Sequence, residues 1–426
     1  MDFMLLKNQI KARLRSLLLK ITPHTHFIPK ELRNWASRHI FGALEGRVKP
    51  PTPYRPGKFR DGVNLFGFFK AENGLAQGTK LYASALEHSG LAHTFVNTDF
   101  LYWLPQNDAT FDDRLSPRPK YAINLIHINP DQWSSACGLF PQTDFNGHYN
   151  IGVWLWELED IPTKWHDTFP YVNELWAPSQ FIASALRKVS PVPVTVIPYG
   201  IEVPVDETLA RADFGLPEDK FLVLAMYDVN SFISRKNPLA AIQAFYDAFG
   251  ANPDKAHLVL KVNNPNDADL TALRELLGAE STYTLITGTI AKTRLNTLIQ
   301  LCDVFISLHR SEGFGLVMAE AMALGLPVVA TNWSANVDFM SEDVACMVDY
   351  DLVPVNNAYQ WGEDGQRWAD AHVDHAAQYL RRLADDPAYY EQKRAAGQRY
   401  ILEHFSVERT ADKMKARVAE ILSEKH

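Results

Sequence analysis

Apolar runs of strand length alternate with helical segments in two series along the chain, and this alternation constrains the fold more than any other feature. The runs are rich in Val, Ile and Leu, and their lengths suit strands that are buried on both faces. Because strands that alternate with helices assemble into parallel sheets, an α/β fold is predicted. The runs cover residues 64–69, 121–128, 149–156 and 194–198 in the first series, and 221–227, 257–263, 283–287, 304–308 and 327–331 in the second.

The two series predict two domains, because 426 residues are too many for one hydrophobic core. We expect an N-terminal Rossmann-like domain over residues 61–198 and a C-terminal Rossmann-like domain over residues 199–386, facing each other across a cleft. Helices are expected over residues 387–426, and packing back on the N-terminal domain is one arrangement open to them.

Composition excludes several classes of protein. With 46% hydrophobic and 22% charged residues, the chain is not a disordered one. Cys137, Cys302 and Cys346 are far apart in sequence, so neither a disulfide framework nor a thiolate metal site is expected. No run reaches the roughly 18 apolar residues of a membrane span, and the N-terminus lacks a signal-peptide cleavage site. A cytoplasmic protein without a metal or other cofactor is expected.

Residues 1–60 form a basic extension, with 13 Lys and Arg against 3 Asp and Glu. Residues 1–22 have helical periodicity, and a proline-rich connector follows them. Such a helix either lies on an anionic membrane surface or braces the protein's own surface, and periodicity does not distinguish the two. We predict peripheral association with the inner face of the cytoplasmic membrane, and no nucleic-acid partner. The apolar stripe comprises Phe3, Leu6, Ile10, Leu14, Leu17, Leu18 and Ile21, and its basic flank comprises Lys7, Lys11, Arg13, Arg15 and Lys20.

The segment Ser311–Pro327 is the most informative motif. It follows a predicted strand, and its glycines allow the backbone to approach a ligand where a helix begins. The amide groups and the positive dipole end of such a helix favour phosphate. The motif therefore predicts an anion site, with Glu312 before the helix and Glu320 inside it.

This segment resembles the signature of the family 4 glycosyltransferases, in which two Glu residues separated by seven positions frame a Gly-Phe-Gly turn. The resemblance spans roughly residues 60–410 and implies the GT-B fold, with the donor site in the C-terminal domain and the acceptor site in the N-terminal domain. It implies that Glu312 approaches hydroxyls of the donor sugar and that Glu320 binds the ribose. It also implies that sugar and phosphate contact the backbone of Gly313, Phe314, Gly315 and Leu316. The alternative is charge at a helix start and a surface Glu.

Arg235 and Lys236 follow the first predicted strand of the second domain. Two cations at the carboxyl end of a parallel strand can neutralise a diphosphate leaving group. They also resemble the phosphate-binding Arg and Lys of the family, although Asp228-Val229-Asn230 replaces the Gly-Arg pair often found just after that strand. The alternative is that they only decorate a helix start, where cations oppose the helix dipole.

The resemblance implies three further contacts with the donor. The loop Lys70–Gly78, which contains Gly74, resembles the glycine loop above the donor phosphates, and a plain strand-to-helix turn is the alternative. His127 ends a predicted strand where the family carries a His that contacts the donor sugar, although a lone His in such a place is commonly structural. Thr287 and Gly288 resemble the nucleotide-contacting loop. Residues 331–340 match a pattern seen in a bacterial branch of the family.

Two other features receive structural interpretations. Asp267-Ala268-Asp269 has the D-x-D form of metal-binding glycosyltransferases of the other major fold, but it precedes a predicted helix, where Asp is a natural cap residue. The tryptophans have spacings typical of core packing rather than of sugar stacking. They are Trp154, Trp156, Trp165 and Trp176.

The resemblance implies a retaining glycosyltransferase. The predicted function is metal-independent transfer of a hexose, mannose or glucose, from a nucleoside diphosphate to a glycan or lipid-linked acceptor, as in bacterial polysaccharide biosynthesis. The predicted catalytic residues are Glu312, His127, Arg235 and Lys236. Two alternatives share the fold and the donor cleft: a non-hydrolysing sugar-nucleotide epimerase, and a catalytically silent binding partner of another transferase.

Overall fold

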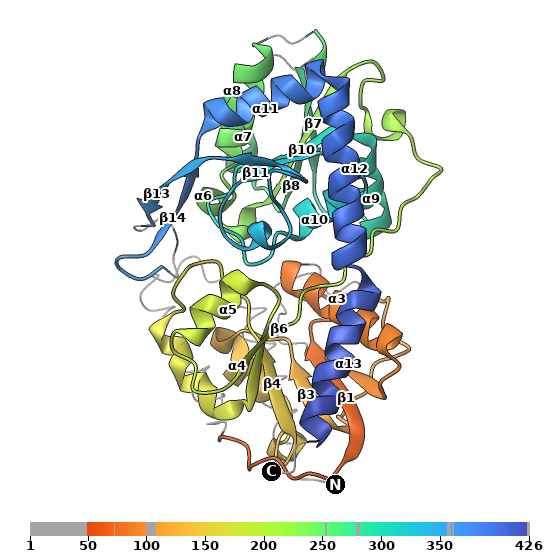
Figure 1. The fold of residues 1–426 in the computed structure, drawn as a ribbon, viewed down its shortest axis with the longest axis vertical. Coiled ribbons are helices and arrows are strands. Elements are labelled where there is room, and N and C mark those ends of the chain that lie inside the picture. The colour runs from red at the N-terminus through yellow and green to blue at the C-terminus, as the bar shows by residue number, and fades with distance from the viewer. Residues whose placement is uncertain are drawn as a thin grey trace.

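The computed structural model describes residues 49–71, 73–98, 108–251, 254–277, 282–355, 359 and 362–423. Two α/β domains lie one above the other, with the N-terminal domain below and the C-terminal domain above in Figure 1. Each domain contains a parallel sheet of six strands. The predicted fold of two Rossmann-like domains is therefore confirmed. The amphipathic helix predicted over residues 1–22 lies outside the described residues.

The N-terminal sheet has the strand order β2-β1-β3-β4-β5-β6. All of its neighbouring strands are parallel, so their carboxyl ends share one edge of the sheet. Helices α3 (Gly74–Ser89), α4 (Pro130–Cys137) and α5 (Gln180–Arg187) follow β1, β3 and β5. The strands are β1 (Arg60–Gly67), β2 (His93–Asn97), β3 (Tyr121–Ile126), β4 (Tyr149–Val153), β5 (Glu174–Ala177) and β6 (Val194–Val196).

The C-terminal sheet has the strand order β12-β11-β10-β7-β8-β9, and an antiparallel hairpin lies beside it. The strands are β7 (Phe221–Asp228), β8 (Ala256–Asn263), β9 (Tyr283–Thr287), β10 (Val304–Ser307), β11 (Val328–Thr331) and β12 (Cys346–Val348), and the hairpin is β13 (Tyr350–Pro354) with β14 (Arg367–Ala371). The helices are α6 (Ile233–Lys236), α7 (Pro238–Phe249), α8 (Asp267–Leu276), α9 (Lys292–Leu301), α10 (Leu316–Ala323) and α11 (Val373–Asp385).

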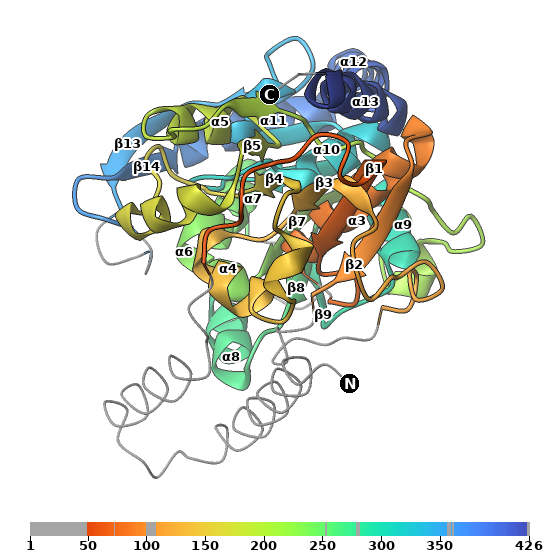
Figure 2. The same cartoon turned by 90° about the horizontal axis from the view of Figure 1, so that it is seen from below.

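The chain crosses between the domains twice, and the two crossings touch. The first is the linker after β6, and the second joins α12 (Pro387–His404) to α13 (Val407–Ser423). Helix α12 packs on α10 and α11, whereas α13 packs on α3 of the N-terminal domain. Figure 1 shows these dark blue helices along one side of both domains, and Figure 2 shows them nearly end-on. The Ile201 amide donates to the Phe405 carbonyl at 2.7 Å, which ties the crossings together.

Several details differ from the sequence predictions. The loop predicted over Lys70–Gly78 is shorter, because the Asn73 side chain accepts from the Ala76 amide at 2.8 Å and caps α3 from Gly74 onward. The sequence did not predict β2, β5, β12 or the β13–β14 hairpin, which are short, and of these β5 begins with a buried Glu174.

The D-x-D segment lies inside a helix rather than before it, and the tryptophans lie in the core. Asp267 and Asp269 lie in the first turn of α8, and Asn266 and Asp269 form a reciprocal capping box there. The four tryptophans named above are all buried, so their rings belong to the core.

Candidate functional site

The turn that carries Glu312 joins β10 to α10 and requires glycine. Gly315 has a φ of 94°, which L side chains rarely adopt. A Cβ at Gly315 would lie 2.6 Å from Met318 Cε, so a side chain would also crowd the first turn of α10. Glycine here therefore lets the backbone turn sharply into the helix, whose free amide groups face the same edge of the sheet.

A neighbouring loop fixes the position of Glu312. The Glu312 amide donates to Ser334 Oγ at 2.9 Å, and the Ala335 amide donates to the Glu312 carbonyl at 3.2 Å. Ser334 itself has a φ of 74°, an uncommon backbone conformation for a residue with a side chain. This loop belongs to residues 331–340, which match a pattern seen in a bacterial branch of the family. In the structure, its hydrogen bonds hold the Glu312 turn in position.

Arg235 and Lys236 meet Glu312 at the carboxyl ends of β7 and β10. The Arg310 amide donates to the Arg235 carbonyl at 2.7 Å, and this bond ties α6 to the chain that follows β10. Arg235 Nη1 lies 3.2 Å from Glu312 Oε1, and the Lys236 ammonium forms a second ion pair with the same carboxylate oxygen. The two cations end α6, a helix of a single turn that directly precedes α7.

The charge cluster formed by Arg235, Lys236 and Glu312 is largely buried, and its charges interact strongly with one another. Burial raises the pKa of the Glu312 carboxyl, but Lys236 and Arg235 outweigh burial and lower this pKa to about 2. Burial lowers the pKa of the Arg235 guanidinium, but Glu312 and Glu157 outweigh it and leave the pKa raised. Glu312 and Arg235 are therefore charged at neutral pH, whereas burial lowers the pKa of the Lys236 ammonium. The Glu312 carboxylate thus pairs with side chains that are also suited to phosphate.

Glu320 lies within α10 and is buried, as its position in the motif predicts. Its Oε1 atom lies 2.6 Å from the ammonium of Lys292, the first residue of α9. A ligand hydroxyl that binds Glu320 would meet a carboxylate already oriented by this cation.

Thr287 and Gly288 end β9 at the same edge of the sheet and are exposed. A buried lysine supports them, because Lys261 Nζ donates to the Gly288 carbonyl and to Asn263 Oδ1. Burial lowers the pKa of Lys261 to about 8. Lys261 thus holds the backbone of this loop in place, while Thr287 and Gly288 remain exposed to solvent.

His127 is fully buried and has no described contact with the charge cluster. Its Nδ1 atom lies 3.2 Å from Thr79 Oγ1, and its Nε2 atom lies 2.8 Å from the Tyr199 hydroxyl. The Thr79 hydroxyl donates to the Leu75 carbonyl, so it accepts from Nδ1, and Nε2 accepts from Tyr199. Burial lowers the pKa of His127 to about 3, so the ring is neutral. Tyr199 packs edge-on against Phe314, with 5.1 Å between centroids, and so lies between His127 and the Gly-Phe-Gly turn.

Gly78, rather than Gly74, is the glycine that close packing requires near this histidine. A Cβ at Gly78 would lie 2.5 Å from the Tyr199 hydroxyl, whereas a Cβ at Gly74 would meet nothing within 4 Å. Gly74 is exposed at the first residue of α3, where amide groups of the helix N-terminus remain free for a ligand.

The N-terminal domain contributes residues that contact the charge cluster and the loops beside it. Ser179 Oγ donates to the Gly313 carbonyl at 2.8 Å while it caps α5, and the Gln180 amide donates to Asp338 Oδ2 at 2.6 Å. Glu157, four residues beyond β4, reaches Arg235 at 3.7 Å and accepts from the Tyr359 hydroxyl at 2.9 Å. The two domains are therefore bridged by polar contacts beside the charge cluster.

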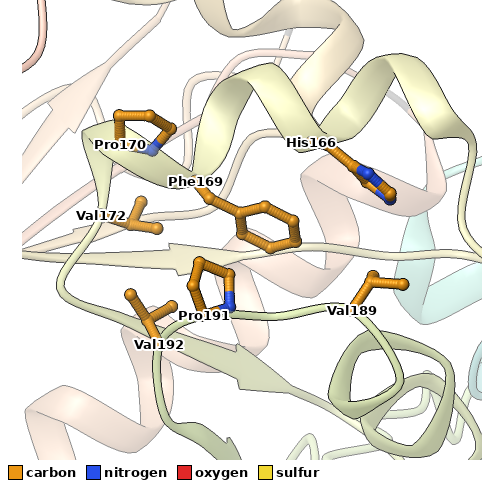
Figure 3. Close-up of a pocket in the computed structure, with 7 residues that line it drawn as sticks. All are labelled: His166, Phe169, Pro170, Val172, Val189, Pro191 and Val192. Atoms are coloured by element: carbon orange, nitrogen blue, oxygen red, sulfur yellow. The ribbon is translucent and has the colours of Figure 1, made fainter.

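An apolar pocket lies elsewhere in the N-terminal domain (Figure 3). Val172 and Val192, which line it, come just before β5 and β6, so the pocket opens at the amino ends of these strands. Ligand sites of open parallel sheets lie at the carboxyl ends, and none of the predicted site residues lines this pocket. The charge cluster is therefore the candidate functional site.

Within the described ranges, no group of three or more His, Cys, Asp and Glu side chains is placed to hold a metal ion. None of the helices in the described part of the chain is long and apolar enough to cross a membrane.

Comparison with known proteins finds similarity over part of the chain. Residues 206–351 match the family model described as "Glycosyl transferases group 1". The D-inositol 3-phosphate glycosyltransferase of Mycobacterium tuberculosis is 30% identical over 242 residues, which are 54% of this chain and 45% of that protein. Its counterpart in Mycobacteroides abscessus is 29% identical over 211 residues, which are 45% of this chain and 44% of that protein. The chain thus spans less than half the length of these curated relatives.

Solved structures show the fold. Anabaena Alr3699/HepE in complex with UDP and glucose superposes with a TM-score of 0.61 at 13% identity, over 84% of this chain and 99% of that chain. Sucrose-phosphate synthase from Thermosynechococcus elongatus gives a TM-score of 0.61 at 15% identity, over 85% of this chain and 100% of that chain. The fold is GT-B, and the resemblance to the family 4 glycosyltransferases is confirmed.

Proposed function

We propose that the chain is a retaining glycosyltransferase that moves a hexose, mannose or glucose, from a nucleoside diphosphate to a glycan or lipid-linked acceptor. The observation that carries this proposal is the convergence of Arg235, Lys236 and Glu312 beside the start of α10. The match of the C-terminal domain to group 1 glycosyltransferases supports it, as do the UDP and glucose bound to the Anabaena neighbour.

The proposed chemistry is leaving-group stabilisation. Arg235 and Lys236 neutralise the departing diphosphate, and the free amide groups at the start of α10 add hydrogen bonds. Glu312 is then released from the cations and accepts hydrogen bonds from the donor sugar, while Glu320, oriented by Lys292, accepts from the ribose. The acceptor hydroxyl attacks the anomeric carbon on the face that the diphosphate leaves and passes its proton to the departing diphosphate. Electrostatic stabilisation of the leaving group and of the developing oxocarbenium charge thus takes the place of a covalent nucleophile.

The proposed reaction needs no metal, because two fixed cations already face the leaving group. Activity is expected to persist in excess EDTA. A complete loss of activity that Mg²⁺ restores would overturn this part of the proposal.

A thermal-shift panel with UDP, GDP and the other nucleoside diphosphates tests the donor site. A ligand at about 100 times its dissociation constant stabilises the fold by about 2.7 kcal/mol, which is readily measured. If none of these diphosphates raises the Tm, the proposed donor site is wrong. Incubation of labelled nucleotide sugar without an acceptor separates transfer from epimerisation, because only an epimerase converts the sugar in the absence of an acceptor.

A further inference from the structure

Glu157 is a carboxylate of the N-terminal domain that contacts three separate segments of the C-terminal domain. Its Oε1 atom lies 3.7 Å from Arg235 Nη2, and its Oε2 atom accepts from the Tyr359 hydroxyl at 2.9 Å. Its main-chain carbonyl accepts from Ser311 Oγ. The side chain is 26% exposed, so its charge is partly accessible to solvent.

Arg235 is held in place without Glu157. Nη1 donates to the Ser311 carbonyl at 2.8 Å and pairs with Glu312. Nη2 faces Glu157, and Nε has no hydrogen-bond partner among the described residues although the residue is only 4% exposed. A guanidinium has five N–H groups, so Arg235 retains donor capacity beyond these contacts.

We propose that Glu157 is a positioning residue that competes with the donor diphosphate for Arg235. Without donor, its carboxylate pairs with the guanidinium across the cleft and holds the two domains together at this point. When a diphosphate binds, Arg235 exchanges Glu157 for phosphate oxygens. The competition sets how strongly the site binds diphosphate, and this inference rests on the proposed donor site.

The negative charge of Glu157 predicts the direction in which its removal changes the affinity for diphosphate. The carboxylate repels a bound diphosphate and must also be displaced from Arg235. A site with a neutral isostere at position 157 therefore binds diphosphate more tightly. Glu157→Gln keeps an oxygen that accepts from Tyr359, and Ser311 and Glu312 still orient Arg235. The substitution therefore removes the negative charge and leaves the geometry of the cation.

Isothermal titration of the full chain with UDP and GDP tests the proposal. We expect Glu157→Gln to bind the preferred diphosphate at least about fivefold more tightly than wild type, with a smaller gain for the corresponding monophosphate, which carries less charge. Glu363→Gln is the matched control. Glu363 also bridges the domains, through the Thr163 amide at 2.8 Å and the Thr163 hydroxyl at 2.9 Å, but has no described contact with Arg235.

The outcomes separate this inference from the proposed function. If wild type binds a diphosphate and Glu157→Gln binds it with equal or lower affinity, the competition is refuted and the donor site stands. An equal gain in Glu363→Gln would show that loosening the domain contact, not the charge of Glu157, changes the affinity. If neither wild type nor Glu157→Gln binds any nucleoside diphosphate, the proposed function and the inference are both refuted.

Discussion

The Tyr199 hydroxyl lies 2.8 Å from Nε2 of His127 and joins the first linker between the domains to the end of β3. Nε2 of this neutral ring accepts one hydrogen bond, and Tyr199 supplies it. A donor-sugar hydroxyl could reach the same atom only after Tyr199 moves. Because Tyr199 also packs on Phe314, its position depends on both domains.

Tyr199→Phe is expected to destabilise the protein by about 1–2 kcal/mol. The change leaves the buried Nε2 of His127 without a donor, and an unsatisfied buried acceptor costs about this much. The difference is measured by denaturant unfolding at pH 7. Tyr400→Phe is the control, since Tyr400 is only half-buried and its hydroxyl has no hydrogen-bond partner among the described residues. Equal stability losses in both variants would contradict the assignment.

The fold could be predicted because its signals are local. Runs such as 221–227 and 283–287 are apolar over the length of a strand, and the structure places β7 and β9 there. The N-cap of α5 is a similarly local feature, since the Ser179 side chain accepts from the Ile182 amide three residues further on. Strand β12 could not be predicted, because three residues carry too little pattern to stand out.

The candidate site could be predicted only where its residues share a motif. Glu312 and Glu320 lie eight positions apart on one turn and helix, so their spacing shows in the sequence. Glu157 and Lys292 join the site from distant segments, and Tyr359 joins it from beyond β13. The one sequence signal for Glu157 is its place just after a strand, at the edge where parallel sheets bind ligands.

Substitution of Arg235 or Lys236 is expected to lower turnover more than it weakens binding of the nucleoside. If each acts as a fixed donor to the leaving group, Arg235→Lys and Lys236→Met should each lose about 2–4 kcal/mol of transition-state stabilisation, which is roughly 30- to 900-fold in kcat. Arg235→Lys keeps the positive charge but not the planar fork of donors. The measurement is steady-state kinetics with the donor selected by the nucleotide panel.

A matched control for these variants lies at the opposite end of the same sheet. Arg211 Nη2 pairs with Asp303 Oδ2 at 2.9 Å, just before β10 begins, and both side chains are partly buried. Arg211→Lys makes the same substitution in a similar ion pair and should leave kcat within about twofold of wild type. Wild-type turnover in Arg235→Lys or Lys236→Met would remove that residue from the site.

The pH dependence of stability should report the Glu312 ion pairs. The pKa of this carboxyl is lowered from 4.5 to about 2 in the folded protein, so its contribution is complete above pH 4.5 and is lost as pH falls from 4.5 towards 2. The shift corresponds to roughly 3 kcal/mol at neutral pH. Wild type should therefore unfold at a higher Tm than Glu312→Gln at pH 7, and the gap should narrow between pH 4.5 and 3. A constant gap over this range would show that the Glu312 charge does not stabilise the fold.

The basic extension leads to a prediction about membrane association, although residues 1–22 lie outside the described residues. Their apolar stripe can lie among lipid headgroups, and each Lys or Arg near an anionic surface adds about 1 kcal/mol. This contact would bring the N-terminal domain to a lipid-linked acceptor. Full-length protein should sediment with anionic liposomes at low salt and be released at high salt, because added ions screen the attraction. A variant with Lys7, Lys11 and Arg15 changed to Gln keeps the stripe and should lose most of this binding. Equal sedimentation of this variant and wild type would show that the basic flank does not hold the protein on the membrane.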